Sequence, residues 1–434
     1  MSVPVSGQSK LRCRDRPETS SPPGPPPGSP PGGCIRAQIC HTGRHQVGVT
    51  TQDPTILSDK ECGLIAWLDV IHEPAHANPA TDRTQPSNPK DRIVSIDVIR
   101  GIAIAGILLI NINYFLSQAG QTEDPVGTDA VIWQIVDDVA LGKFHFIFAF
   151  LFGTGVFIFL SRLRAKNRSA WVYVRRMIIL IAAGVINSAL GGIDVLASYG
   201  VLALLLLPLT RLPRWAFVFL GVAAAAVPDV LQLASSLGDL QPPALLFPIL
   251  SYVRTLGHMM LGFWLTGLGL YSAATRIPVT GIFVLSLLGS VPIWIWTTAA
   301  GTGSTEAHEI AFRTALVPGL MYVTGLILLL RTRFGRKCLS FLRLYGRMAF
   351  SNYLGQTVIC VLVLPLLTGL GHISAVDGLV IWAVIVLAQC AFSTVWLRYF
   401  RYGPLEWVWR CGTYWEFTPL RYAPDTRAEP AAQS

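Results

Sequence analysis

Residues 95–115 read SIDVIRGIAIAGILLININYF, and this stretch decides the class of the protein. Asp97 and Arg100 are its only charged residues, and fifteen uncharged residues follow Arg100. An apolar run of about this length crosses the ~30 Å hydrocarbon core of a bilayer as an α-helix. A helix that is apolar on every face belongs inside a large core or a membrane. The stretch therefore predicts a transmembrane helix.

The composition of the whole chain extends this prediction. Of the 434 residues, 52% are hydrophobic and 14% are charged, whereas soluble domains carry roughly a quarter charged residues. The N-terminal part differs, because residues 1–90 hold 14 of the 29 prolines and cannot bury enough apolar surface to offset their chain entropy. We predict a disordered extension over 1–91, or a mis-assigned start, then a transmembrane domain over 92–414 and a polar tail over 415–434.

Further apolar runs follow the first one and predict an all-α, polytopic helical bundle with about ten transmembrane helices. No run of comparable length precedes residue 92. The expected spans are 96–116, 144–161, 174–191, 193–210, 215–235, 246–271, 279–300, 310–330, 349–370 and 377–397.

The charges between these spans predict their orientation. Basic residues fill the loops at 162–176, 211–214, 276, 331–347 and 398–410, whereas acidic residues gather in the alternate loops. Ten spans with both termini in the cytoplasm place every basic loop on the cytoplasmic side, as the positive-inside rule requires. The formal charge of +9 then reflects membrane topology, and no nucleic-acid partner is expected.

Polar residues inside the first span are candidate binding groups, because an ionisable residue in a membrane is costly unless it has a role. Asp97 and Arg100 are three residues apart and share a helix face. Asn111 lies about 16 Å further along the axis on the same face. The same residues also suit plain structural roles, with the arginine extending to the interface and the asparagine packing between helices.

Candidate catalytic and binding residues also gather near the predicted outer ends of other spans. His145, beside Lys143, and His258, four residues after Arg254, are candidate general bases. Asp194 is expected to orient a histidine, to balance Arg254 or simply to cap a helix. Asn187, at the same outer turn as Asp194, is a further candidate for substrate binding. Asn352 and Gln356 share a face of the span 349–370 and are candidates for substrate binding or for hydrogen bonds across helices.

Several familiar sites are missing from the sequence. It contains no phosphate-binding GxxxxGK[ST] loop, no GxSxG elbow, no HExxH motif and no dinucleotide-binding glycine pattern. The cluster Cys34, Cys40, His41 and His45 matches no standard zinc spacing. We expect neither a metal site nor a tightly bound cofactor.

Five segments resemble a known family. They are RIVSIDVIRGIAIAGILLINI at 92–112, KFHFIFAFLFGTG at 143–155, RRMIILIAAGVINSALGGIDVLASYG at 175–200, GRMAFSNYLGQ at 346–356 and STVWLRYFRYGPLEWVWRCGTY at 393–414. In order and wording they resemble the YeiB-like membrane proteins, the domain-of-unknown-function family numbered 418. This resemblance implies a bacterial, multi-pass protein of the cell membrane, with an N-terminal half followed by a C-terminal half.

The resemblance also implies a distant similarity to transmembrane acyltransferases, among them the type-3 O-acyltransferases and the heparan-glucosaminide N-acetyltransferases. In those proteins the first span carries an aspartate and an arginine-glycine pair, and a histidine or an asparagine follows eleven residues after the arginine. Here that position is Asn111, so the base would have to be His145 or His258. Arg100 would bind the phosphates of a cytoplasmic acyl-CoA. Position 187 departs from the expected histidine.

Three hypotheses for function remain open. The first is an acyltransferase that moves an acyl group from cytoplasmic acyl-CoA to an envelope glycan, a lipid or a small metabolite. In it His145 or His258 deprotonates the acceptor, Asp194 orients or balances charge, and Arg100 holds the donor. The second is a transporter or exporter without covalent chemistry, and the third is a structural or sensory membrane protein.

Overall fold

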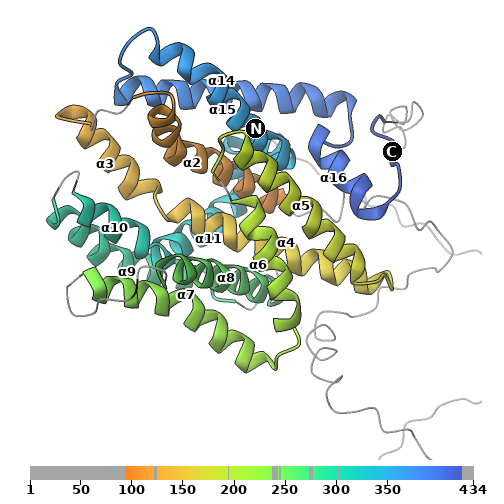
Figure 1. The fold of residues 1–434 in the computed structure, drawn as a ribbon. Helices are drawn as coiled ribbons and strands as arrows, with labels where there is room; N and C mark the ends of the chain where they lie inside the picture. The colour runs from red at the N-terminus through yellow and green to blue at the C-terminus, as the bar shows by residue number, and fades with distance from the viewer. Residues whose placement is uncertain are drawn as a thin grey trace, which may run out of the picture. The chain divides into compact units, whose positions relative to one another are not determined.

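The computed structural model describes residues 94–121, 125–193, 195–236, 243, 246–272, 277–301 and 304–422. The predicted N-terminal extension and Asp194 lie outside these residues. All regular elements within them are α-helices (Figure 1). They are α2 (Val94–Gln118), α3 (Thr128–Ala140), α4 (Lys143–Ala165), α5 (Trp171–Ala189), α6 (Leu196–Leu209), α7 (Arg214–Ser236), α8 (Leu246–Gly267), α9 (Val279–Ala299), α10 (Thr305–Arg313), α11 (Leu316–Arg331), α12 (Arg333–Cys338), α13 (Leu342–Arg347), α14 (Ala349–Thr368), α15 (Ala375–Tyr399) and α16 (Pro404–Tyr414).

Helices occupy all ten of the predicted spans, but they differ in their ability to cross a bilayer. In the described residues, seven helices are long and apolar enough, or eight if α10 and α11, which meet at a bend of 53°, form one span. The apolar helix α6 has 14 residues, fewer than a bilayer crossing needs. The protein is therefore a multi-pass membrane protein, and the count of ten stays a prediction.

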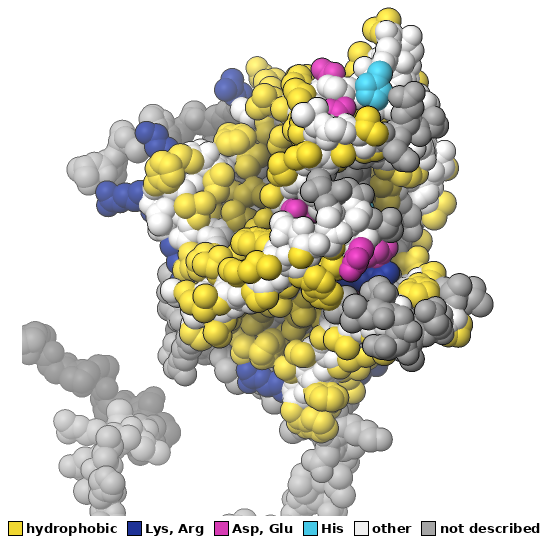
Figure 2. Space-filling view, turned by 90° about the vertical axis from the view of Figure 1, so that its left-hand side faces the viewer, with side chains coloured by type: hydrophobic (Ala, Val, Ile, Leu, Met, Phe, Trp, Pro, Cys, Tyr) yellow, Lys and Arg dark blue, Asp and Glu magenta, His cyan; other side chains and the backbone are white. Residues whose placement is uncertain are grey.

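The surface of the bundle is apolar, as a protein in lipid requires. Large hydrophobic side chains point outward from several helices, for example Phe219 of α7 (73% exposed), Leu285 of α9 (72%) and Leu366 of α14 (71%). Figure 2 shows hydrophobic side chains over much of the described surface on the face it presents. Apolar side chains exposed over so much of a surface would promote aggregation in water. Backbone groups, by contrast, are satisfied inside the helices.

Helix α8 packs against both α4 and α7. Close contact between α4 and α8 depends on two glycines, because a Cβ atom at Gly153 would lie 1.9 Å from the carbonyl oxygen of Met259 and one at Gly262 would lie 2.0 Å from that of Phe150. Small residues let membrane helices approach in this way. Gly155, two residues further along α4, faces open space and makes no such contact. The α4–α8 contact sets the relative positions of the polar residues described below.

The bundle has two chemically different ends. At the acidic end, α3 contacts α10, and at the arginine-rich end, α13 contacts α2 and α16 contacts α5. In Figure 1, α3 and α10 lie to the left and α16 lies to the right. Arg347 donates to the carbonyl of Arg401, and the indole of Trp409 donates to the carbonyl of Arg176. Three predicted basic segments thus meet at one end, and its location in the cytoplasm stays a prediction.

Several helices occur where the sequence predicted loops. The acidic segment between the first two spans contains α3, and the segments before and after other spans contain α10, α12, α13 and α16. These helices have 6 to 13 residues. None is a long apolar run by itself, although α3 continues into α4 within one candidate span, Thr128–Ala165, and α10 forms a bent pair with α11.

Candidate functional site at the acidic end

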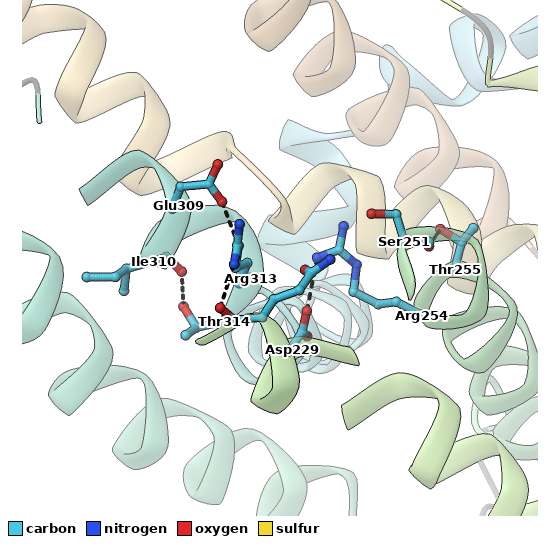
Figure 3. A network of polar contacts seen from close by, with 9 residues as sticks. Asp229, Ser251, Arg254, Thr255, Glu309, Ile310, Arg313 and Thr314 are labelled. Atoms are coloured by element: carbon cyan, nitrogen blue, oxygen red, sulfur yellow. Dashed lines mark hydrogen bonds and ion pairs between the residues drawn. The ribbon is translucent and has the colours of Figure 1, made fainter. Parts of the chain in front are cut away.

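A buried ion pair lies near the acidic end of the bundle (Figure 3). Arg254 of α8 donates from Nη1 to Oδ1 of Asp229 of α7 over 3.0 Å, and both side chains are largely buried, at 8% and 14% exposed. The guanidinium of Arg254 also lies 4.4 Å from the centre of the Phe312 ring. Asp229 is therefore the carboxylate that balances Arg254, a role that the sequence offered to Asp194.

A second arginine connects α10 to the same region. Arg313 donates from Nε to Glu309 over 2.5 Å and from Nη1 to the backbone carbonyl of Gln232 over 2.7 Å. Figure 3 shows Arg313 and Arg254 on either side of Asp229. Helix α10 begins at a cap in which the Ser304 hydroxyl accepts from the backbone N–H of Ala307. The cap and the arginine together hold α10 against the end of α7.

Both candidate histidines lie beside Arg254. The His145 ring meets the edge of the same Phe312 ring at 5.9 Å between centres, and the His258 ring meets that of Phe146 at 4.7 Å. Both imidazoles are within electrostatic range of Arg254. Helices α4 and α8 thus bring His145 to Arg254 and His258, which the sequence placed on another span.

Each histidine has one ring nitrogen that is buried without a hydrogen-bond partner. These atoms are Nδ1 of His145 and Nε2 of His258. A buried polar atom without a partner costs about 1–3 kcal/mol, and such atoms are uncommon enough in native proteins to need an explanation. His258 is 5% exposed, whereas His145 is half-buried. Of the two residues, His145 is thus the more exposed, although its Nδ1 atom is buried.

Two further predicted residues are Lys143, next to α10, and Asn187, at the turn after α5. Lys143, fully buried, directs Nζ toward the backbone carbonyls of Asp137 and Ala311, each at 3.4 Å. Asn187 at the end of α5 donates to the carbonyl of Ile193 over 3.2 Å, while its Oδ1 is buried without a partner. Lys143 therefore links α3 and α10, and Asn187 orders the turn before α6.

Asp97 and Arg100 lie at the opposite, arginine-rich end. Oδ1 of Asp97 is 3.3 Å from Nη1 of Arg100, and the Arg100 side chain is 30% exposed. Helix α13 lies directly on this segment, because Cβ atoms at Gly101 and Gly346 would lie 2.6 Å and 1.9 Å from backbone oxygens of the other helix. The two helices thus approach closely at Gly101, and Arg100 stays at the surface of that end. Asn111, further along α2, is buried.

Asn352 and Gln356 belong to a separate network among α13, α14 and α15. Asn352 donates to the Tyr345 carbonyl and the Ser393 hydroxyl, over 2.9 and 3.0 Å. Gln356 donates to the Tyr345 hydroxyl over 2.8 Å, and Gln389 donates to the Asn352 carbonyl over 3.0 Å. These amides hydrogen-bond across helices, the structural role that the sequence held open for them.

The structure thus divides the predicted site residues into three places. His145, His258, Arg254 and Lys143 lie at the acidic end, Asp97 and Arg100 at the other end, and Asn352 and Gln356 in the α13–α15 network. Sequence reasoning missed Asp229 and Phe312. Asp229 could have been identified from the sequence, because it is an aspartate inside an apolar span. Phe312 could not, because its contacts with Arg254 and His145 exist only in the folded bundle.

A groove elsewhere on the described surface contains none of these residues. It has a volume of about 690 Å³ and lies along α7 and Trp264 of α8, where Trp215, Val218, Phe219 and Val222 give it an apolar lining. Its walls match the lipid-facing surface around it.

Each half of the membrane domain matches a known protein family model. Residues 264–416 match the protein family of unknown function numbered 418. The chain is 28% identical to YeiB of Escherichia coli over 380 residues, which cover 74% of this chain and 96% of that protein. The membrane domain is similar to that of YeiB. The predicted resemblance is therefore confirmed.

Other relatives and a second family model extend the similarity. YxaH of Bacillus subtilis is 27% identical, covering 77% of this chain and 98% of that protein, and a 39.9 kDa protein of Bacillus acidopullulyticus is 28% identical, covering 75% and 94%. Residues 92–254 match the catalytic region of heparan-alpha-glucosaminide N-acetyltransferase. This match suggests an acyltransferase-like function. No solved structure gave a significant match.

The two family matches meet inside α8. The acetyltransferase-like part ends at Arg254 and the YeiB-like part begins at Trp264, within one helix of 22 residues.

The GPLEWVWR tail of the YeiB-like half has a clear structural role. Glu406 accepts from the N–H groups of Phe350 and Ser351 over 2.8 and 3.1 Å and so caps the start of α14. Burial raises the pKa of this carboxyl above its ordinary value, against the effect of those hydrogen bonds.

Proposed function

We propose that the protein is a transmembrane acyltransferase that moves an acyl group from cytoplasmic acyl-CoA to an acceptor at the acidic end of the bundle. The observation that carries the proposal is the pair of buried histidine nitrogens without partners beside Arg254. A neutral imidazole nitrogen without a partner is free to accept a proton. The similarity of residues 92–254 to an N-acetyltransferase catalytic region supports the same chemistry.

The proposed reaction assigns each group a role. His145 takes the proton from an acceptor hydroxyl or amine, whose oxygen or nitrogen then attacks the thioester carbonyl carbon. Arg254 stabilises the negative charge that develops on the carbonyl oxygen. The carbon–sulfur bond then breaks, and the CoA thiolate leaves and receives the proton from the imidazolium. Acceptors that suit this reaction are an envelope glycan, a lipid or a small metabolite.

The remaining residues hold the reacting groups or the substrate in place. Asp229 holds Arg254 through the 3.0 Å hydrogen bond, and Arg100 binds donor phosphate at the far end as a planar guanidinium fork. His258 is the second candidate base. Asp194 is proposed to orient a histidine. Arg100 and Asn111 lie about 16 Å apart along α2, so a long donor is needed to reach from one end of the bundle toward the other.

The test is release of free CoA thiol by the purified protein in nanodiscs, with acetyl-CoA as donor and a panel of hydroxyl and amine acceptors. His145→Ala and His258→Ala are compared with His372→Ala, which removes a histidine that is 54% exposed. We expect turnover to fall in the His145 variant and to persist in the His372 variant. Wild-type turnover in both His145 and His258 variants would contradict the proposed base. Acceptor uptake into vesicles without thiol release would support a transporter instead.

A further inference from the structure

A group of arginines and aromatic rings at the arginine-rich end lies outside the proposed catalytic centre. Arg176 of α5 is held between two rings, with its guanidinium 3.6 Å from the centre of the Trp409 ring and 4.9 Å from that of Phe159. The Trp409 indole donates to the backbone carbonyl of Arg176 over 3.0 Å. Stacking holds the plane of a guanidinium while its N–H groups stay available at the edge.

Helix α16 adds a second arginine beside the first. The guanidinium of Arg410 lies 5.1 Å from the Tyr414 ring and 5.2 Å from the Tyr402 ring. Arg168, from the segment before α5, lies 5.3 Å from the same Tyr414 ring. Arg410 and Arg100 are both within electrostatic range of Arg176. Four guanidinium groups therefore lie near the contact between α5 and α16.

The two central arginines of this group have no carboxylate partner among the described residues. Neither Arg176 nor Arg410 forms an ion pair with a described acidic residue, and Nε of Arg410 is buried without a hydrogen-bond partner. Asp97 is paired with Arg100. Glu406 is engaged with the start of α14, and Glu416 is exposed. Like charges repel at close range, so this group favours an anion.

We propose that Arg176 and Arg410 form a binding site for an organic phosphate at the arginine-rich end, with Arg168 and Arg100 at its edge. Guanidinium forks match phosphate oxygens in charge and geometry. The aromatic rings suit the planar base of a nucleotide, and the same phosphate chemistry is offered by the headgroup of an anionic lipid. None of these α5 and α16 arginines was singled out as a binding residue from the sequence.

This site deepens the proposed function, on which its assignment to the acyl donor rests. Phe159, which stacks on Arg176, lies 14 residues after His145 in α4, or about 21 Å along the helix axis. A donor that carries phosphates at one end and a thioester at the other would place its phosphates here and its reactive carbon near the histidines. Phosphate binding itself can be measured without any acyl transfer.

The experiment titrates the full-length protein in phosphatidylcholine nanodiscs with adenosine 3′,5′-bisphosphate, by calorimetry. Arg410→Gln, Arg410→Lys and Arg176→Gln are compared with Arg333→Gln, which removes an exposed arginine near the same end. A second series measures thermal stabilisation by phosphatidylglycerol included in the nanodiscs. Each variant is first tested for monodispersity and for wild-type helical content, so that a folding defect is recognised.

We expect the nucleotide to bind and Arg410→Gln to weaken binding by about tenfold or more, with Arg410→Lys in between because it keeps charge but loses the fork. Arg333→Gln should bind as the wild type does, and added salt should weaken binding. Stabilisation by phosphatidylglycerol that Arg410→Gln abolishes, with no nucleotide binding, would support the phosphate site and assign it to a lipid headgroup. Equal binding by wild type and Arg410→Gln, or no response to either probe, would overturn the proposal.

Nucleotide binding without thiol release in the acyl-transfer assay would leave this site standing and remove the proposed function. Thiol release that Arg176→Gln and Arg410→Gln do not affect, in KM or in kcat, would leave the proposed function standing and remove the assignment of this site to the acyl donor. The two proposals therefore fail through different measurements.

Discussion

Two polar groups inside the bundle differ in how completely their hydrogen bonds are made. In the α13–α15 network, the side-chain nitrogens of Asn352, Gln356 and Gln389 all donate to oxygen atoms of neighbouring residues. At the acidic end, His145 and His258 each keep a buried nitrogen without a partner. A satisfied network stabilises and orients helices, whereas an unsatisfied atom costs free energy that function can explain. The comparison teaches which buried polar residues to test for catalysis and which for stability.

The largest effect is expected at His145, whose buried ring nitrogen has no hydrogen-bond partner. His145→Ala should lower kcat by about 100-fold or more, because positioned general bases typically contribute 10²–10⁴-fold. The melting temperature should change little, since the variant removes a ring nitrogen that has no hydrogen bond to lose. Steady-state thiol release and a thermal unfolding scan measure the two quantities. A large loss of stability with kcat intact would make His145 a structural residue.

Breaking the ion pair beside the histidines should come next in size. Asp229→Asn should lower the free energy of unfolding by about 3–5 kcal/mol, because it leaves Arg254 buried without its carboxylate. Denaturant unfolding in mixed micelles measures the loss. Glu309→Gln is the matched control, because Glu309 also pairs with an arginine but is 39% exposed, so its effect should be smaller. Equal losses in both variants would contradict the prediction that burial makes the Arg254–Asp229 pair more important for stability than the Arg313–Glu309 pair.

A smaller effect is expected in the satisfied network. Asn352→Ala should lower stability by about 1–3 kcal/mol, because the Tyr345 carbonyl and the Ser393 hydroxyl lose a donor in a buried setting. The kcat of the folded fraction should stay at the wild-type value. If kcat or KM instead changes while the melting temperature holds, Asn352 binds substrate, as the sequence also allowed.

The smallest effect is expected at the exposed rim of the acidic end. His308 contacts Asp137 over 2.9 Å, but its side chain is 52% exposed. His308→Ala should therefore change the free energy of unfolding by at most about 1 kcal/mol and leave turnover unaltered. Thermal scans and thiol release on this variant provide the baseline for the buried histidines. A loss of turnover comparable to that of His145→Ala would extend the catalytic group to α10.

Membrane helices were predictable where the signal is local. The run after Arg100 becomes α2, and the run around Phe150 becomes α4, because length and apolarity alone decide whether a segment can span lipid. The short helix α3 was not predicted from run length and apolarity. Its 13 residues include three aspartates, a composition equally suited to a solvated loop, and its contacts with α10 arise only in the fold.

The candidate site was predictable by residue type but not by partner. His145, His258 and Arg254 stood out because ionisable residues in apolar spans are costly. That Arg254 pairs with Asp229 and shares the Phe312 ring with His145 depends on how α4, α7, α8 and α10 meet. Residues from four helices contact one another there, and their order in the chain does not encode those contacts.

The sequence by itself was enough to predict a polytopic membrane protein with a YeiB-like pattern. Hydrophobic run length, loop charge and short sequence motifs are all properties of short segments. Only the tertiary structure decided which polar residues are satisfied and which are not. Helix packing brings the Asn352 network to full hydrogen bonding, leaves a nitrogen of each histidine unpaired, and gathers Arg176 and Arg410 at the opposite end. Burial and partnership are properties of the whole bundle, so no single segment carries them.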